Sequence, residues 1–132
     1  MDRPLILVVE DNPTEQRIVS ILLEKFGYTA HVVDNGAKAL EAVQSNMPFA
    51  LILMDWQMED MNGLECSRRI RQLEQKTGRH MPIVAVTARV LLGDRQKCME
   101  AGMDDYLSKP YTAAQFEQML AAWTSHTVSL TG

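Results

Sequence analysis

Apolar runs of strand length alternate with amphipathic, helix-like stretches five times along the 132 residues of this chain. Such alternation predicts a doubly wound α/β fold, in which a five-stranded parallel sheet carries helices on both faces. A chain of this length fits one domain with one hydrophobic core. No internal repeat, low-complexity segment or linker divides it. The strands are expected at residues 5–9, 28–33, 51–55, 83–86 and 105–107.

Capping signals and helical spacing locate the expected helices. Asn12 and Pro13 provide an N-cap and a first helical residue, and Glu15 stands three residues after Asn12, as in a variant of the capping box. Apolar residues at helical spacing are expected to face the core: Ile18, Val19, Leu22, Leu23 and Phe26 in the first helix, Leu64, Ile70 and Leu73 in the third, and Phe116, Met119, Leu120 and Trp123 in the last. A solvated face is expected on the third helix, formed by Arg68, Arg69 and Arg71.

Composition and charge argue against several classes of protein. The net charge is −4 and the sequence contains no block of Lys or Arg, which argues against direct nucleic-acid binding. The longest apolar runs have strand length, so no membrane contact is expected. The N-terminus lacks the features of a signal peptide, so we expect a cytoplasmic location. The two cysteines, Cys66 and Cys98, show no metal-ligand spacing, and we expect them to be reduced thiols. Residues 1–125 are expected to form the domain, followed by a polar tail at 126–132.

Polar side chains stand where the expected strands end. Glu10 and Asp11 follow the first strand, Asp55 ends the third, Thr87 ends the fourth, and Lys109 follows the fifth. In a parallel sheet these ends meet at one edge, and ligands of open α/β sheets bind at that edge. The sequence therefore predicts three carboxylates, one hydroxyl and one ammonium around a small space.

Three carboxylates in so small a space would either shift their pKa values strongly or need a cation. Two carboxylates about 4 Å apart repel by roughly 4 kcal/mol at an effective dielectric constant near 20. Lys109 offsets one charge, and a hard divalent ion with oxygen ligands, Mg²⁺, would offset the others. Such a site can accept a phosphoryl group, with Thr87 as a hydrogen-bond donor and a carboxylate as the nucleophile. Asp55 lies between the other groups in a five-strand arrangement and is the better nucleophile.

Taken singly, each of these residues has an ordinary structural interpretation. Glu10 and Asp11 suit the N-terminus of a helix, and an Asp after a strand is most often a turn residue. Thr87 is a common strand residue and Lys109 a common surface residue. The chemical interpretation depends on their expected proximity. His31, His80 and His126 lie in no motif and are not expected to be phosphohistidine sites.

Five short segments stand in the order and at the intervals of a known family. They contain Glu10-Asp11-Asn12, Leu53-Met54-Asp55, Met61-Asn62-Gly63, Val86-Thr87-Ala88 and the stretch from Ala101 to Pro110. On these segments the chain resembles the receiver domain of bacterial two-component response regulators, over about residues 4–124, and is most similar to receivers of hybrid sensor histidine kinases. The resemblance implies a flavodoxin-like sheet with strand order 2-1-3-4-5.

The resemblance also implies a role for each site residue. Asp55 would accept a phosphoryl group from the phosphohistidine of a histidine kinase or a histidine phosphotransfer domain. Asp11 would bind Mg²⁺ directly with help from Glu10, and the main-chain carbonyl of Gln57 would be a further ligand. Lys109 would pair with the phosphoryl oxygens, and its bond to Pro110 would be cis. A further pair, Thr87 and Tyr106, would form a switch that alters the face made by the fourth helix, fifth strand and fifth helix.

Departures from the family pattern lie close to the nucleophile. Glu59 stands where receivers usually have proline, so the loop after the third strand is expected to be less rigid and more negative. Trp56 is a bulky residue directly after Asp55. The residues at the positions of Gln57 and Arg89 tune the lifetime of the phosphoryl group in this family.

Other functions remain open at this point. A Mg²⁺-dependent phosphatase with an Asp nucleophile usually has a second Asp two residues later, where this chain has Gln57. A flavodoxin-type cofactor binder needs a phosphate-binding loop after the first strand, where Glu10 and Asp11 would repel phosphate. A scaffold receiver that is never phosphorylated is a further alternative. We expect no enzymatic turnover beyond phosphorylation and dephosphorylation of the chain itself, and both a single-domain relay and a receiver of a hybrid kinase fit the sequence; the oligomeric state is left open.

Overall fold

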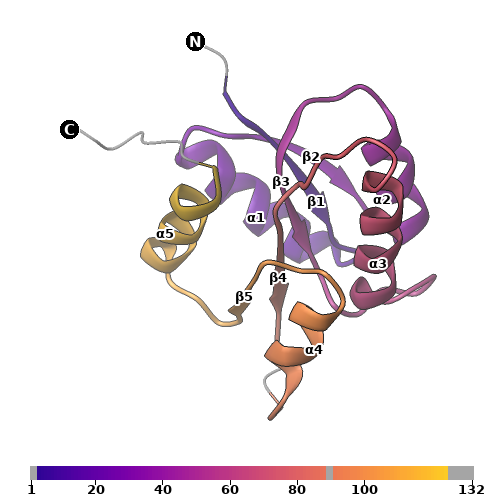
Figure 1. Cartoon of the computed structure of the whole chain (residues 1–132). Helices are drawn as coiled ribbons and strands as arrows, with labels where there is room; N and C mark the ends of the chain where they lie inside the picture. The colour runs from indigo at the N-terminus through magenta and orange to yellow at the C-terminus, as the bar shows by residue number, and fades with distance from the viewer. Residues whose placement is uncertain (1–2, 89–90, 125–132) are drawn as a thin grey trace.

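A computed structural model describes residues 3–88 and 91–124, in which parallel strands form one twisted sheet covered by helices (Figure 1). The strand order is β2-β1-β3-β4-β5 and all pairings are parallel. The expected fold class and strand order are confirmed. The polar tail at 126–132, His126 and Arg89 lie outside the described residues. The strands are β1 (Leu5–Val9), β2 (Thr29–Val33), β3 (Phe49–Met54), β4 (Ile83–Thr87) and β5 (Asp105–Ser108), and the helices are α1 (Pro13–Lys25), α2 (Gly36–Gln44), α3 (Gly63–Glu74), α4 (Asp94–Glu100) and α5 (Ala113–Thr124).

The core consists of two layers, one on each face of the sheet. Successive strand residues point to opposite faces, so Leu7 and Val9 belong to one layer while Ile6 and Val8 belong to the other. Helices α2, α3 and α4 cover the first layer, and α1 and α5 cover the second. Figure 1 shows α1 and α5 on one side of the strands and α2 and α3 on the other. Within the described ranges, no helix has the length and apolar character needed to cross a membrane.

Asparagine side chains begin three of the helices. Asn12 Oδ1 accepts a hydrogen bond from the Glu15 backbone N–H at 3.0 Å, and Pro13 is the first residue of α1, as expected. Asn35 and Asn62 cap α2 and α3 in the same way. Each of these caps follows a strand directly or after a short loop, so the helix N-termini lie near the carboxyl edge of the sheet. Local capping chemistry thus places three helix starts beside the candidate site.

Two expectations about side-chain direction are wrong. Ile18 was expected in the core, but 42% of it is exposed, because Val19 and Leu23 supply the fully buried positions of α1. Arg71 was expected in solvent, but its side chain is only 16% exposed. Its guanidinium turns back toward the chain, pairs with Glu74 and also hydrogen-bonds to backbone carbonyls outside α3. Arg68 and Arg69 are exposed, as expected.

The remaining apolar predictions hold in the main. Phe116, Met119 and Leu120 are buried in the layer under α5, and Trp123 packs against that layer with part of its surface exposed. Cys66 and Cys98 are buried thiols in α3 and α4, in agreement with the expectation of reduced cysteines.

Candidate functional site

Three carboxylates meet at the carboxyl edge of the sheet. Glu10 and Asp11 follow β1, and Asp55 follows β3, which is the neighbour of β1. The ladder continues just beyond the strands, because the Asp55 backbone N–H donates to the Val9 carbonyl at 3.0 Å. Each of the three carboxylates offers an oxygen, and these oxygens lie within 4.8 Å of one another. The neighbouring parallel strands β1 and β3 therefore place three carboxylates close enough for one metal ion to contact all of them.

Thr87 and Lys109 approach the same space from the other half of the sheet. Thr87 is the last residue of β4 and is buried. Lys109 directly follows β5, its backbone N–H donates to the Thr87 carbonyl at 2.9 Å, and its bond to Pro110 is cis, as expected. The Lys109 ammonium pairs with Glu10 Oε1 at 3.4 Å and with Glu15 Oε1 at 2.9 Å. We call Glu10, Asp11, Asp55 and Lys109 the strand-end cluster.

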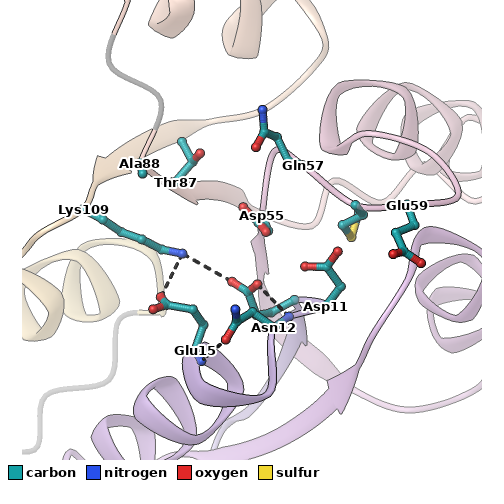
Figure 2. A pocket seen from close by; sticks show the side chains of 11 residues that line it. Asp11, Asn12, Glu15, Asp55, Gln57, Glu59, Thr87, Ala88 and Lys109 are labelled. Carbon is teal, nitrogen blue, oxygen red and sulfur yellow. Dashed lines mark hydrogen bonds and ion pairs between the residues drawn. The ribbon is translucent and has the colours of Figure 1, made fainter.

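An open cavity of about 690 Å³ surrounds the strand-end cluster (Figure 2). Gln57, Glu59 and Thr87 also line it, so the structure brings every residue of the predicted phosphoacceptor and metal sites to one place.

Tyr106 lies elsewhere: it packs against the core layer under α2, α3 and α4. Its strand neighbour across the β4–β5 pair is Ala85, two residues before Thr87. The switch role of Tyr106 and Thr87 stays a prediction.

The carboxylates of this cavity repel one another and are poorly solvated. Burial, followed by the charge of Asp55, raises the pKa of Glu10 from 4.5 to about 7. Burial also raises the pKa of Asp55, although hydrogen bonding with Glu10 and the Lys109 charge oppose the increase. Burial lowers the pKa of Lys109, but its hydrogen bond to Glu15 and the charges of Glu10 and Asp55 outweigh this effect, so that the pKa is raised. The cluster contains three carboxylates and one ammonium, so its acids outnumber its cation, and the raised pKa values show that their ionisation is opposed.

The donor set suits a hard divalent cation. Mg²⁺ prefers oxygen ligands and commonly uses one or two carboxylates together with water and phosphate oxygens. Glu10, Asp11 and Asp55 supply carboxylate oxygens, and the cavity is open on one side, so water and a phosphoryl group can enter. The residues present therefore fit a Mg²⁺ ion.

Sequence reasoning missed the second partner of Lys109. Glu15 was interpreted as the second half of a capping box, in which its carboxylate would accept from the Asn12 backbone N–H. That N–H donates instead to Glu10 Oε2 at 3.1 Å, and the Glu15 carboxylate pairs with Lys109. The capping-box interpretation is wrong in this half, because a charged partner from a strand end 94 positions later competes for the same carboxylate. Only the position of Glu15 in the first turn of α1, near the expected sheet edge, could have indicated this contact.

Asp60, in the loop after β3, and Gly63, at the start of α3, also support the site. Asp60 accepts hydrogen bonds from the backbone N–H groups of Gly36 at 3.0 Å and Ala37 at 2.9 Å, which ties this loop to the start of α2. Burial tends to raise the pKa of Asp60, but these bonds outweigh it and lower the pKa. Gly63 is the first residue of α3, and a Cβ atom there would collide with the Asp55 carbonyl oxygen. The lower rigidity predicted for the loop after β3 from Glu59 is untested. The hydrogen bonds of Asp60 to the start of α2 hold this loop in place, and the sequence analysis did not predict them.

Relatives of known sequence match nearly the whole chain. A family model described as the response regulator receiver domain matches residues 6–121. The hybrid signal transduction protein dokA of Dictyostelium discoideum is 48% identical over 118 residues, which are 89% of this chain and 7% of that protein. The sensor histidine kinase GacS of Pseudomonas protegens is 41% identical over 122 residues, which are 92% of this chain and 13% of that protein. The chain thus spans only a small part of the length of these relatives.

Solved structures show the same fold. The receiver domain of a sensor histidine kinase from Pseudomonas aeruginosa, solved with a magnesium ion in its active-site cleft, is 37% identical, has a TM-score of 0.84, and covers 95% of this chain and 100% of its own. A Saccharomyces cerevisiae complex of the histidine phosphotransfer protein Ypd1 with the receiver domain of Ssk1 matches at 28% identity with a TM-score of 0.85, covering 98% of this chain and 94% of its own. These findings favour neither a phosphatase nor a flavin-type binder. The chain belongs to the response regulator receiver domain family, the receiver modules of two-component phosphorelays.

Proposed function

We propose that Asp55 accepts a phosphoryl group from the phosphohistidine of a histidine kinase or a histidine phosphotransfer protein, in a reaction that needs Mg²⁺. The observation that carries this proposal is the strand-end cluster itself. Asp55 offers an oxygen within 4.8 Å of those of two further carboxylates, and Lys109 lines the same open cavity. The excess of negative charge there is hard to explain as a stabilising feature, because like charges at this separation raise the free energy of the folded state.

The transfer is a displacement at phosphorus. A carboxylate oxygen of Asp55 forms a P–O bond while the P–N bond of the donor breaks, and the electron pair of that bond remains on the imidazole nitrogen. Lys109 pairs with the phosphoryl oxygens, and the Thr87 hydroxyl donates a hydrogen bond to one of them. In the later hydrolysis, water attacks phosphorus and Asp55 leaves as a carboxylate with inorganic phosphate as the other product.

Carboxylate oxygens of Glu10, Asp11 and Asp55, with the main-chain carbonyl of Gln57, would hold the Mg²⁺ ion. When bound, the ion supplies positive charge next to the transferring phosphoryl group. The spacing of the three carboxylates supports this assignment, as does the magnesium ion in the similar receiver from Pseudomonas aeruginosa. Glu10 has a second task, since its carboxylate also pairs with Lys109 and accepts from the Asn12 N–H.

The consequence of phosphorylation is a change of the face made by α4, β5 and α5. The Thr87 hydroxyl moves toward the phosphoryl group, and the Tyr106 ring moves into the space that this opens. Thr87 and Tyr106 lie on the neighbouring strands β4 and β5, which supports their coupling.

The partner carries a phosphohistidine, and the reaction takes place in the cytoplasm. The yeast complex of a receiver with a histidine phosphotransfer protein supports a partner of this kind. The larger relatives are sensor histidine kinases and hybrid signalling proteins, which supports residues 1–125 as a receiver module that serves such a kinase.

Mass spectrometry tests the phosphoacceptor assignment. The protein is incubated with Mg²⁺ and acetyl phosphate, and we expect one phosphoryl adduct that hydroxylamine removes, as it does from an acyl phosphate. The adduct is absent after chelation of Mg²⁺ and in Asp55→Asn. Asp34→Asn, the same change at an exposed Asp paired with Lys38, keeps the adduct. An undiminished adduct in Asp55→Asn, or none in the wild type, contradicts the proposal.

A further inference from the structure

The Lys109 ammonium is shared between two carboxylates that are not the proposed phosphoacceptor. Its shorter ion pair is with Glu15 Oε1 at 2.9 Å, and the longer is with Glu10 Oε1 at 3.4 Å. The side chain of Lys109 is 19% exposed and that of Glu15 is 31% exposed. Figure 2 shows the Lys109 side chain extending along the cavity, with a dashed line from its nitrogen to the carboxylate of Glu15. The ammonium is thus already engaged at the rim of the site before any phosphoryl group arrives.

Glu15 is held in place by the start of α1. Its backbone N–H donates to Asn12 Oδ1 at 3.0 Å, and Pro13 fixes the first turn. The carboxylate therefore projects from a capped helix toward Lys109 and is not part of a mobile loop.

We propose that Glu15 is a positioning residue that withholds the Lys109 ammonium from the phosphoryl group and so disfavours the phosphorylated state. The inference rests on the proposed function of Asp55 and Lys109. A phosphoryl group on Asp55 needs the ammonium, and Lys109 must leave Glu15 to supply it. Glu15 then loses its partner and faces additional negative charge, because Asp55 with its phosphoryl group is more negative than Asp55 alone.

A simple field effect is the competing explanation. Any carboxylate that lines the cavity repels a phosphoryl group, whether or not it touches Lys109. Glu59 provides the matched control, since it lines the same cavity and carries the same charge. In the described part of the chain, the ion pairs of the Lys109 ammonium are those with Glu10 and Glu15. Glu15→Gln and Glu59→Gln therefore remove equal charge, and only the first removes a contact of Lys109.

The experiment compares the wild type, Glu15→Gln and Glu59→Gln at saturating Mg²⁺. Two quantities are measured: the rate of phosphorylation by acetyl phosphate and the apparent affinity for beryllium trifluoride, a phosphoryl mimic. We expect both to rise about threefold to tenfold in Glu15→Gln, the range expected for loss of one charged, partly exposed partner. The same quantities change less than about twofold in Glu59→Gln, as expected for a weak field effect. Equal effects of the two substitutions overturn the inference.

A crystal structure of the wild-type protein with Mg²⁺ and beryllium trifluoride shows which groups the Lys109 ammonium contacts, and a field effect alone does not change these contacts. We expect the Lys109 ammonium to contact a fluorine atom and to have left Glu15. An ammonium that keeps its ion pair with Glu15 overturns the inference. The proposed function is tested separately by the wild type alone: without any phosphoryl adduct on Asp55 that function fails, whereas an adduct with equal rates in both variants rejects only the role of Glu15.

Discussion

Two charged clusters lie at opposite edges of the same sheet, and they differ in how well their carboxylates are neutralised. The strand-end cluster lies at the carboxyl edge. The second, which we call the Arg71 cluster, lies at the other edge, where β4 and β5 begin. It consists of Arg71, Glu74, His80 and Asp104.

The Arg71 cluster supplies a donor for each carboxylate. Arg71 donates to Glu74 Oε1 at 2.6 Å and to Asp104 Oδ2 at 2.8 Å. The remaining carboxylate oxygens contact the Met81 backbone N–H at 2.7 Å and the His80 ring at 2.7 Å. The guanidinium also donates to the carbonyls of Gly102 and Met81, so one side chain joins α3 to the turns before β4 and β5.

The strand-end cluster has the opposite character. It contains three carboxylates and one ammonium, of which only Glu10 pairs directly with Lys109, and burial with the charge of Asp55 raises the pKa of Glu10 to about 7. The comparison teaches that a partly buried group of acids is not by itself a functional site. A cluster whose donors and acceptors match stabilises the fold, whereas a cluster with excess charge binds something that supplies the missing charge.

The largest expected effect comes from opening the Arg71 cluster. Arg71→Met should lower the free energy of unfolding by about 3 kcal/mol, because it leaves two partly buried carboxylates without their guanidinium. Urea denaturation with and without Mg²⁺ measures it, and the loss should be the same in both. Arg68→Met on the exposed face of the same helix is the control and should change stability by less than about 0.5 kcal/mol. Equal stability of the two variants would contradict the comparison.

The next effect concerns the support of Asp55. Gly63→Ala places a Cβ atom against the Asp55 carbonyl oxygen and the Met54 side chain, so the backbone at the site must move. We expect a loss of stability of about 2 kcal/mol and a fall in phosphorylation by acetyl phosphate of at least about tenfold. Gly36→Ala is the matched control at the first position of α2, where the new methyl meets the Met61 side chain and no backbone atom of the site. If phosphorylation falls equally in both variants, the close contact at Gly63 is not the cause.

The third prediction concerns how the free energy of unfolding depends on pH through Glu10 of the strand-end cluster. The pKa of Glu10 is raised by folding from 4.5 to about 7, so between these values the folded state binds more protons than the unfolded state. The free energy of unfolding therefore falls as pH rises through this window, by about 1–3 kcal/mol in the absence of divalent ions. Urea denaturation at several pH values in a chelator measures this fall. Mg²⁺ should reduce it and Glu10→Gln should remove most of it; an unchanged slope in Glu10→Gln contradicts the assignment.

The smallest effect has the opposite sign to the first. Without Mg²⁺ at about pH 8, Asp55→Asn should raise the free energy of unfolding by about 1 kcal/mol, because it removes one of three mutually repelling charges. Thermal or urea unfolding measures this gain, and added Mg²⁺ should stabilise the wild type more than the variant. Asp34→Asn, which removes a charge from an exposed ion pair with Lys38, should show no gain. A destabilised Asp55→Asn would mean that the strand-end cluster is neutralised in the same way as the Arg71 cluster.

Local signals predicted much of this fold. The Asn12-Pro13 start of α1 and the Asn caps of α2 and α3 follow from hydrogen bonds within three residues, which a sequence displays directly. The meeting of Glu10, Asp55 and Lys109 was also predictable, because parallel strands with right-handed crossovers bring their carboxyl ends to one edge.

Predictions about side-chain direction failed where the partner lies far along the chain. Helical spacing placed Arg71 in solvent, and that expectation was wrong. The partners of Arg71 include Asp104 and the carbonyl of Gly102, more than thirty positions away. The carboxylate of Glu15 likewise pairs with Lys109 and not with the backbone N–H of Asn12. The spacing of apolar residues predicts which face of a helix points to the core. It contains no information on charged or polar partners that lie far along the chain.

The sequence by itself determined the alternation of strands and helices and the edge of the sheet at which the acids lie, because these follow from local propensity and from the direction of parallel strands. The tertiary structure alone decided which carboxylates share Lys109, why residue 63 is glycine, and which charged cluster is neutralised. The physical reason is that charge pairing and close packing depend on distances of a few ångströms between elements, and those distances are set only when the layers pack together.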